Sequence, residues 1–135
     1  MHAIYLDTSA AVKLFKEEPE SAALERWLAG YGSALVLTSD LTRCELRRAL
    51  EAAKAGQPAR REAEEWLNDC ALIRLTRDLC DRAGALAPDV PLRSLDALHT
   101  CAALSLGRAL VAFVAYDHRL IDAAKQTGLP VSSPG

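Results

Sequence analysis

Four acidic residues occupy positions from which their carboxylates could act together in one place. They are Asp7, Glu45, Asp96 and Asp117. Asp7 and Asp117 each follow a short apolar run that is typical of a buried strand, so both are expected at the carboxyl edge of a sheet. Asp96 is the only formally charged residue between Arg93 and Arg108, on a predicted helix that is apolar all round. A carboxylate on such a helix enters an environment of low dielectric constant.

Glu45 is located by its angle on a predicted helix. At about 100° per residue it falls on the small and apolar side, close to Ala49 and away from Arg43 and Arg47. An acid at that angle is either at the edge of the surface or turned inward toward a partner. The three aspartates also have a structural alternative, because an aspartate at a helix start or turn commonly caps the helix.

Carboxylates that gather in one cleft repel one another, so they must protonate or be neutralised by a cation. Hard oxygen ligands select Mg²⁺ or Mn²⁺, with water in the remaining coordination positions. A metal of this kind lowers the pKa of a bound water, orients a phosphodiester and stabilises charge on the leaving oxygen. Taken together, the four acids predict hydrolysis of a phosphate ester with water as the nucleophile.

The rest of the chain supplies alternating strands and helices that position these acids. Its 135 residues are 50% hydrophobic and 25% charged, the proportions of one globular domain over residues 1–135. Strands are expected at 2–6, 34–38, 71–75 and 110–116, with a marginal fifth at Val131. Helices are expected at 10–15 (capped by Ser9), 20–29, 40–55, 58–68, 77–87, 95–106 and 118–127. Continuous apolar strands separated by helices predict an α/β fold, a three-layer α/β/α sandwich with a central, mostly parallel sheet.

Composition and termini narrow the class further. The net charge of −2 gives no overall attraction to nucleic acid. No apolar stretch approaches the roughly 20 residues of a membrane helix, and the N-terminus lacks the basic start and cleavage site of an export signal. We therefore expect a cytoplasmic protein without membrane association. The four cysteines have no C-x-x-C spacing and are expected to be reduced.

Four short motifs carry the acids in order along the chain. They are Tyr5-Leu6-Asp7-Thr8-Ser9-Ala10, Ser39-Asp40-Leu41-Thr42-Arg43-Cys44-Glu45-Leu46, Leu95-Asp96-Ala97-Leu98-His99 and Ala115-Tyr116-Asp117-His118-Arg119-Leu120. Each motif is short and would recur by chance, but four in this order and spacing form a specific signal. The pattern resembles the PIN-domain ribonucleases of the VapC toxin type, and the resemblance extends over essentially the whole chain.

This resemblance implies a PIN-like, Rossmann-like sandwich. It also implies a catalytic and metal-binding set made up of Asp7, Glu45, Asp96 and Asp117. Thr8 or Ser9 matches the hydroxyl that helps to hold the first acid or a metal water. The relatives are endoribonucleases, which cleave RNA, are held inactive by an antitoxin encoded beside them and commonly form homodimers. They often carry Thr or Ser where this chain has Ala115.

Several further residues have both a functional and a structural interpretation. Arg93 and Arg119 are close in sequence to Asp96 and Asp117, and are candidates for contacts with phosphate or for pairing with these acids. The arginines of the helices expected at 40–55 and 58–68 are interpreted as a solvated charged face. His99 is interpreted as a neutral histidine with its hydrogen bonds satisfied inside a buried helix.

Two other functions fit parts of the pattern. A phosphoacceptor receiver or an aspartyl phosphatase also has an aspartate after its first strand. Aspartyl phosphatases need a second acid where this chain has Ser9, and receivers need a lysine at a late strand end, whereas Lys125 lies within the last predicted helix. A non-catalytic PIN-like binding module would keep the acids without the reaction. We expect a divalent-metal-dependent endoribonuclease and retain these two alternatives.

Overall fold

All strands of the central sheet run in the same direction. The computed structural model describes residues 1–135, and its strands are β1 (Ala3–Leu6), β2 (Leu35–Ser39), β3 (Ala71–Ile73), β4 (Leu110–Val114) and β5 (Val131–Ser132). They form one five-stranded sheet in the order β3-β2-β1-β4-β5, with every neighbouring pair parallel. Parallel pairing requires a crossover between successive strands, which the helices provide. The prediction of an α/β sandwich with a parallel sheet is confirmed.

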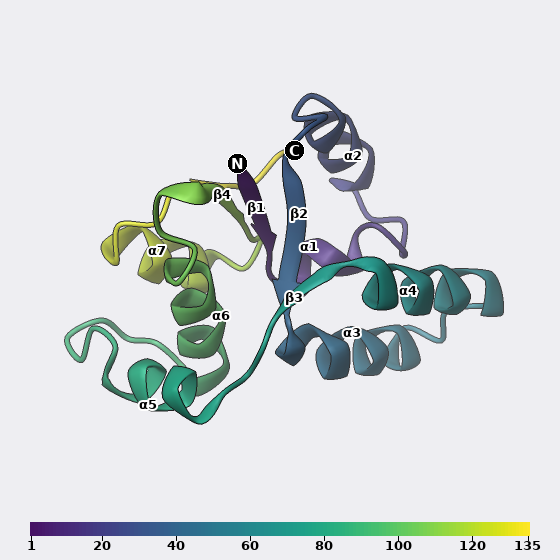
Figure 1. Ribbon diagram of the computed structural model, residues 1–135. Helices are drawn as coiled ribbons and strands as arrows, with labels where there is room; N and C mark the ends of the chain where they lie inside the picture. Colours follow the sequence, from purple (N-terminus) through teal and green to yellow (C-terminus); the bar gives the residue numbers. More distant parts are fainter.

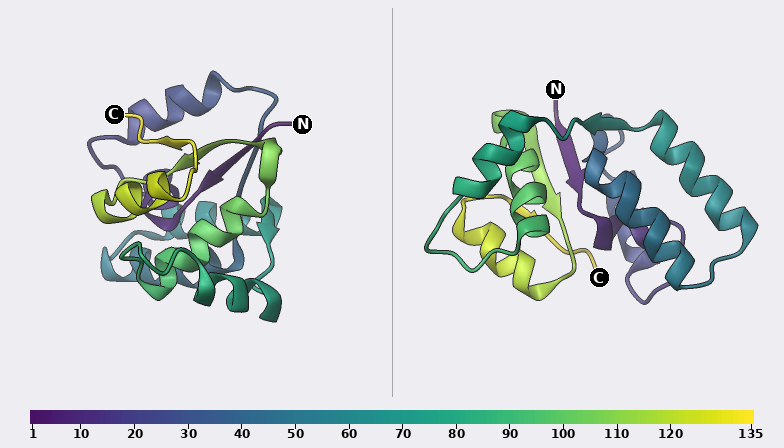
Figure 2. Two further views of the ribbon diagram at one scale, coloured as in Figure 1. Left: turned by 90° about the vertical axis from the view of Figure 1, so that its left-hand side faces the viewer. Right: turned by 90° about the horizontal axis from the view of Figure 1, so that it is seen from below.

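Seven α-helices and one short 3₁₀ helix, η1 (Gly107–Ala109), connect the strands. The α-helices are α1 (Thr8–Val12), α2 (Ser21–Ala29), α3 (Asp40–Ala52), α4 (Gln57–Asp69), α5 (Arg77–Ala85), α6 (Ser94–Leu104) and α7 (His118–Gln126). Helices α5, α6 and α7 lie on one side of the sheet, and α1 to α4 lie on the other (Figure 1 and Figure 2). None of these helices has the length and apolar character needed to cross a membrane.

The residues of β1 alternate between two cores, and both are buried. Tyr5 points into a cluster with Phe113 and residues of α5, α6 and α7, whereas Ile4 and Leu6 pack with Leu24 of α2 on the opposite face. A strand that is covered on both faces loses the polar alternation of a half-exposed strand. This explains the continuous apolar run at the start of the chain, and it fixes β1 at the centre of the sheet.

Several element ends differ by a few residues from the sequence-based expectation, and three of them have a visible cause. The first helix begins at Thr8 with Asp7 at its N-cap, because the Asp7 carboxylate accepts the Ala10 N–H. Strand β4 stops at Val114, since the Tyr116 N–H donates to the Ser9 hydroxyl at 3.0 Å. Helix α3 ends at Ala52, near Lys54, whose left-handed φ of 54° is incompatible with helix continuation.

Helices α3 and α4 form a hairpin with a small core of their own. That core consists of Leu46, Leu50, Ala63 and Leu67. On its outer face Arg47 donates two hydrogen bonds of 2.8 Å to Glu64, and Arg60 donates one of 2.6 Å to Glu51. These arginines are thus paired with acids, as expected for a charged, solvated face.

The Arg47–Glu64 pair is exposed, so its contribution to stability should be small. We expect Glu64→Gln to lower the free energy of unfolding by less than about 1 kcal/mol, because water and salt screen exposed ion pairs. Urea unfolding at low and high salt measures this. A decrease in the free energy of unfolding above about 2 kcal/mol would contradict this and would mean that the pair stabilises the hairpin substantially.

Candidate functional site

Asp7 is the most buried of the four acids, with 4% of its surface exposed. It follows β1 directly and its Oδ1 accepts hydrogen bonds from the Ser9 hydroxyl at 2.7 Å and the Ala10 N–H at 3.0 Å. Burial, the largest cause, and the charge of Glu45 together raise the pKa of Asp7 to about 6, against the opposing effects of His99 and these two hydrogen bonds. The carboxylate is therefore held in place but is costly to ionise.

Glu45 lies half-buried on α3 and faces inward. Its Oε1 accepts a hydrogen bond from Thr8 Oγ1 at 2.6 Å and lies 2.8 Å from Nε2 of His99. Burial alone would raise the pKa of Glu45, but the hydrogen bonds from His99 and Thr8, with the charge of His99, lower it below its ordinary value. Of the two interpretations left open by its helical angle, the inward one is correct.

Asp96 comes from α6, and Asp117 comes from the segment that joins β4 to α7. Asp96 lies in the first turn of α6 and is half-buried, and its carboxylate makes no hydrogen bond within the protein. Asp117 is exposed and is the N-cap of α7, where its carboxylate accepts a hydrogen bond from the Arg119 N–H at 3.0 Å. Burial raises the pKa of Asp96 and the charge of Asp117 raises it further; Arg93 and His99 oppose this, and Glu45 adds to it. The pKa of Asp96 is thus raised in part by acids that belong to other elements of the fold.

The charges of the acids influence one another's pKa values, in agreement with a position at one end of the sheet. The charge of Glu45 contributes to the raised pKa of both Asp7 and Asp96, and the charge of Asp117 contributes to that of Asp96. This follows from topology, because β1 and β4 are parallel neighbours whose carboxyl ends meet at one edge. However, no three His, Cys, Asp or Glu side chains stand in an arrangement that could enclose an ion. Three of the four carboxylates are instead turned to the hydrogen-bond donors nearest to them.

Each of those carboxylates keeps one oxygen free. In Asp7, Glu45 and Asp117 all hydrogen bonds from the protein go to a single oxygen, and the other oxygen has no partner. Thr100 Oγ1 is the only fully buried side-chain oxygen or nitrogen without a partner, so the free oxygen of Asp7 still reaches solvent. Free carboxylate oxygens with mutual repulsion fit the donor set that Mg²⁺ or Mn²⁺ prefers.

The two hydroxyl residues of the first motif act on different acids. Ser9 donates to Asp7, in agreement with the hydroxyl expected to hold the first acid, while Thr8 donates to Glu45. Arg93 is exposed at the start of α6, and its charge opposes the rise in the pKa of Asp96. Arg119 is exposed, and it is the backbone N–H of this residue that binds Asp117.

A buried polar network beneath the acids is the feature that sequence reasoning missed. His99 is 3% exposed, as expected of a buried histidine, yet it contacts Glu45 on one side and the Tyr5 hydroxyl on the other. Thr42 extends the network toward Thr8 at 3.0 Å. The only signal in the sequence is that His99 follows Asp96 by one helical turn, which puts both on one face of α6.

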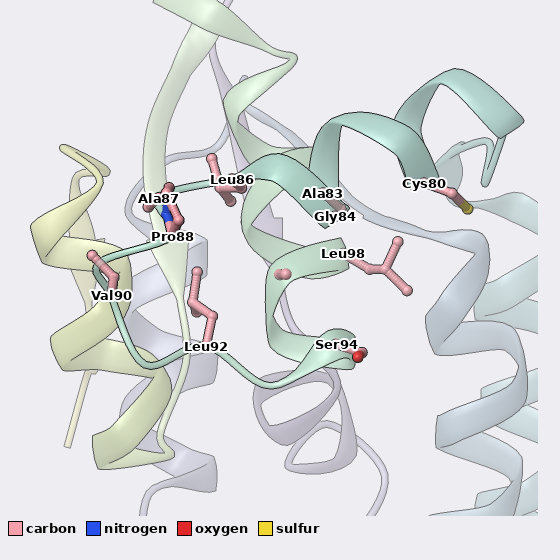
Figure 3. Close-up of a pocket in the computed structure, with 11 residues that line it drawn as sticks. Cys80, Ala83, Gly84, Leu86, Ala87, Pro88, Val90, Leu92, Ser94 and Leu98 are labelled. Atoms are coloured by element: carbon pink, nitrogen blue, oxygen red, sulfur yellow. The ribbon is translucent and has the colours of Figure 1, made fainter.

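The largest cavity of the molecule, of about 410 Å³, lies elsewhere, between α5, the loop after it and α6. Figure 3 shows its apolar lining, which includes Leu86, Val90, Leu92 and Leu98 and contains no acidic residue. A cavity of this composition offers nothing to a phosphodiester or a cation. We therefore place the candidate site at the acids rather than at this cavity.

Comparison with known proteins decides the family. The PIN domain family matches residues 4–126. Ribonuclease VapC47 of Mycobacterium tuberculosis (strain CDC 1551 / Oshkosh) is 42% identical over 136 residues, covering 98% of this chain and 97% of the relative. The chain belongs to the PIN-domain family, in its VapC group. The four acid-bearing motifs all lie within residues 4–126, the part of the chain that the family matches.

Solved structures agree with this PIN fold. VapC20 of Mycobacterium tuberculosis, described as a Sarcin-Ricin loop cleaving toxin, superposes with a TM-score of 0.74 at 19% identity and covers 97% of this PIN domain and 99% of that chain. VapBC2 from Rickettsia felis, bound to a DNA fragment from their promoter, gives a TM-score of 0.75 at 13% identity and covers 98% and 99%. At these identities the likeness is one of fold.

Proposed function

We propose that this VapC-type PIN domain, residues 1–135, is a divalent-metal-dependent endoribonuclease and the toxin of a type II toxin–antitoxin pair. The observation that carries the proposal is the edge where the Glu45 charge acts on both Asp7 and Asp96 and where Asp7 and Glu45 each keep a free carboxylate oxygen. The name of the 42% identical relative, Ribonuclease VapC47, supplies the reaction class.

Four residues would hold the metal, directly or through waters. They are Asp7, Glu45, Asp96 and Asp117. A bound Mg²⁺ or Mn²⁺ supplies activation of water and stabilisation of charge on the departing oxygen. Burial, together with repulsion from neighbouring acids, raises the pKa of Asp7 and Asp96, and a bound cation would offset both effects.

The chain's own side chains orient this site and meet the substrate. Ser9 and the Ala10 N–H fix one oxygen of Asp7, and Thr8 fixes one oxygen of Glu45. RNA approaches a cluster of negative carboxylates, so its phosphates need nearby positive charge. Arg93 and Arg119 are exposed beside Asp96 and Asp117 and can supply it through two-pronged contacts with phosphate.

The partners follow from family membership. We propose a cognate antitoxin that keeps the ribonuclease inactive, a homodimer as the state of the toxin, and the cytoplasm as the compartment in which it meets RNA. No membrane partner is proposed. Co-expression with the neighbouring reading frame, followed by purification of the complex, tests the antitoxin assignment.

The decisive experiment maps RNA ends after pulse expression of the wild-type protein and of Asp96→Asn. We expect the wild type to create new RNA ends and Asp96→Asn to create about 100-fold fewer, because loss of a free carboxylate weakens both metal binding and charge stabilisation. Asp81→Asn on α5, an exposed aspartate without a hydrogen-bond partner, is the matched control and should cut like the wild type.

Absence of new RNA ends from the wild type would reject the ribonuclease assignment and favour a binding module. An acid-labile phosphate on Asp7 after treatment with acetyl phosphate would instead favour the phosphoacceptor alternative. Equal cutting by Asp96→Asn and the wild type would remove Asp96 from the site and leave the reaction class in place.

A further inference from the structure

His99 bridges the core of the sheet and the acidic edge. Its Nε2 lies 2.8 Å from Glu45 Oε1, and its Nδ1 lies 2.7 Å from the Tyr5 hydroxyl. The imidazole is almost completely buried, so it has no water with which to exchange these contacts. A planar ring bound at both nitrogens has a fixed orientation, unlike a flexible side chain at the surface.

Tyr5 anchors the other end of this chain of contacts. Its ring is fully buried in the centre of the sheet and stacks on Phe113, with 5.5 Å between ring centroids and 10° between planes. Its hydroxyl donates to Ser39 Oγ at 3.0 Å, which ties β1 to the end of β2. The Tyr5 oxygen is therefore placed by two strands of the sheet, on the side of His99 away from Glu45.

We propose that Tyr5 and His99 are positioning residues that hold the Glu45 carboxylate in the orientation needed to bind the divalent ion. This inference rests on the proposed function, because it takes Glu45 as a metal ligand. The geometry is selective: His99 and Thr8 both reach Oε1, and Oε2 is left without a partner. One oxygen is thus fixed by the fold while the other stays available at the acidic edge.

Thr8 alone does not explain this orientation. It is only partly buried and its hydroxyl lies within 3.0 Å of Thr42 as well as 2.6 Å from Glu45, so it can turn between two partners. A buried tyrosine and histidine are also costly unless their polar atoms are satisfied. Apolar residues would fill that space at lower cost, which points to a role for the polar pair outside simple packing.

The test measures Mn²⁺ binding to purified protein by calorimetry, and not activity alone. We expect Tyr5→Phe, which removes one hydroxyl, to weaken Mn²⁺ affinity about 10-fold, as supporting residues of metal ligands commonly do. In His99→Asn the shorter amide can still reach Tyr5 but not Glu45, so Mn²⁺ affinity should fall by about 10-fold to 100-fold. His99→Gln, whose longer amide reaches toward Glu45, should recover much of the affinity.

Cleavage kinetics and a matched control separate positioning from stability. For Tyr5→Phe at a fixed, subsaturating Mn²⁺ concentration we expect kcat to fall about 10-fold with KM for RNA unchanged, because the substrate does not touch the pair. Tyr116→Phe also removes one tyrosine hydroxyl, which donates to the Pro134 carbonyl, and it should keep the wild-type Mn²⁺ affinity. Thermal unfolding of each variant checks that the protein is folded.

The outcomes distinguish this inference from the proposed function. Weaker Mn²⁺ binding by folded Tyr5→Phe and His99→Asn, with recovery in His99→Gln, supports positioning. Unchanged affinity in Tyr5→Phe and His99→Asn, with a wild type that binds Mn²⁺ and cuts RNA, overturns the role of the pair and leaves the ribonuclease intact. A wild type that neither binds Mn²⁺ nor cuts RNA overturns both.

Discussion

Asp7→Asn is expected to lower the rate of RNA cleavage by about 10³-fold, because a neutral amide neither attracts a divalent ion nor balances its charge. Metal activation supplies several kcal/mol, and a loss of about 4 kcal/mol corresponds to about 10³-fold at 1.36 kcal/mol for each factor of ten. The fold should survive, since the amide oxygen can still accept from Ser9 and the Ala10 N–H. Cleavage of a labelled RNA by purified protein, together with growth of expressing cells, measures this.

The matched substitution Asp81→Asn controls for loss of one negative charge at a site remote from the acids. It should retain full cleavage, because Asp81 is exposed on α5 and has no partner. If Asp7→Asn cut RNA at the wild-type rate in saturating Mg²⁺, Asp7 would have no place in the metal site. The other three acids would then have to be reassessed without it.

The sheet was predictable because burial on both faces leaves a clear mark in the sequence. The run from Ala3 to Leu6 has no polar alternation, and each core strand is followed by a helix, so a parallel sheet was the only consistent arrangement. The ends of elements were less predictable. Whether Asp7 or Ser9 caps α1 depends on side-chain rotamers and on the Tyr116 N–H, which lies more than a hundred residues away in the chain.

The candidate site divides in the same way. The positions of Asp7 and Asp117 at strand ends follow from topology, so both could be assigned to one edge from the pattern alone. The angle of Glu45 left two orientations, and only its contacts with Thr8 and His99 choose the inward one. Local periodicity carries no information about which residues of separate elements meet.

The contact between Tyr5 and His99 also could not be predicted from the sequence. A buried aromatic in a strand and a buried histidine in an apolar helix are each ordinary core residues when taken alone. Their contact joins residues that are 94 positions apart, and nothing in either local pattern predicts it. The acids could be found because charge in an apolar context is conspicuous, whereas their supporting residues match their surroundings.

Burial of Asp7 also predicts an unusual dependence of stability on pH in metal-free protein. The pKa of Asp7 rises from 3.8 to about 6 on folding, chiefly through burial, so the folded state binds more protons than the unfolded state between these values. Stability from this group is therefore fully present below pH 3.8 and is lost as pH rises through about 6. The total loss is about 3 kcal/mol, of which about 1 kcal/mol falls between pH 5 and pH 7.

Asp7→Asn removes this group, so at pH 7 in EDTA the variant should be more stable than the wild type by up to about 3 kcal/mol, with the difference shrinking toward pH 5. Urea unfolding of both proteins across that range gives the difference directly, with Asp81→Asn as the matched control. Parallel curves for Asp7→Asn and the wild type would show that Asp7 ionises without cost. Added Mg²⁺ should stabilise the wild type, by about 2.7 kcal/mol at 100 times its Kd, and leave Asp7→Asn nearly unchanged. Burial makes the ionised Asp7 carboxylate unfavourable without metal and makes a bound cation beside it favourable. Asp7→Asn should therefore show both effects, a gain in stability in EDTA and a loss of RNA cleavage with metal.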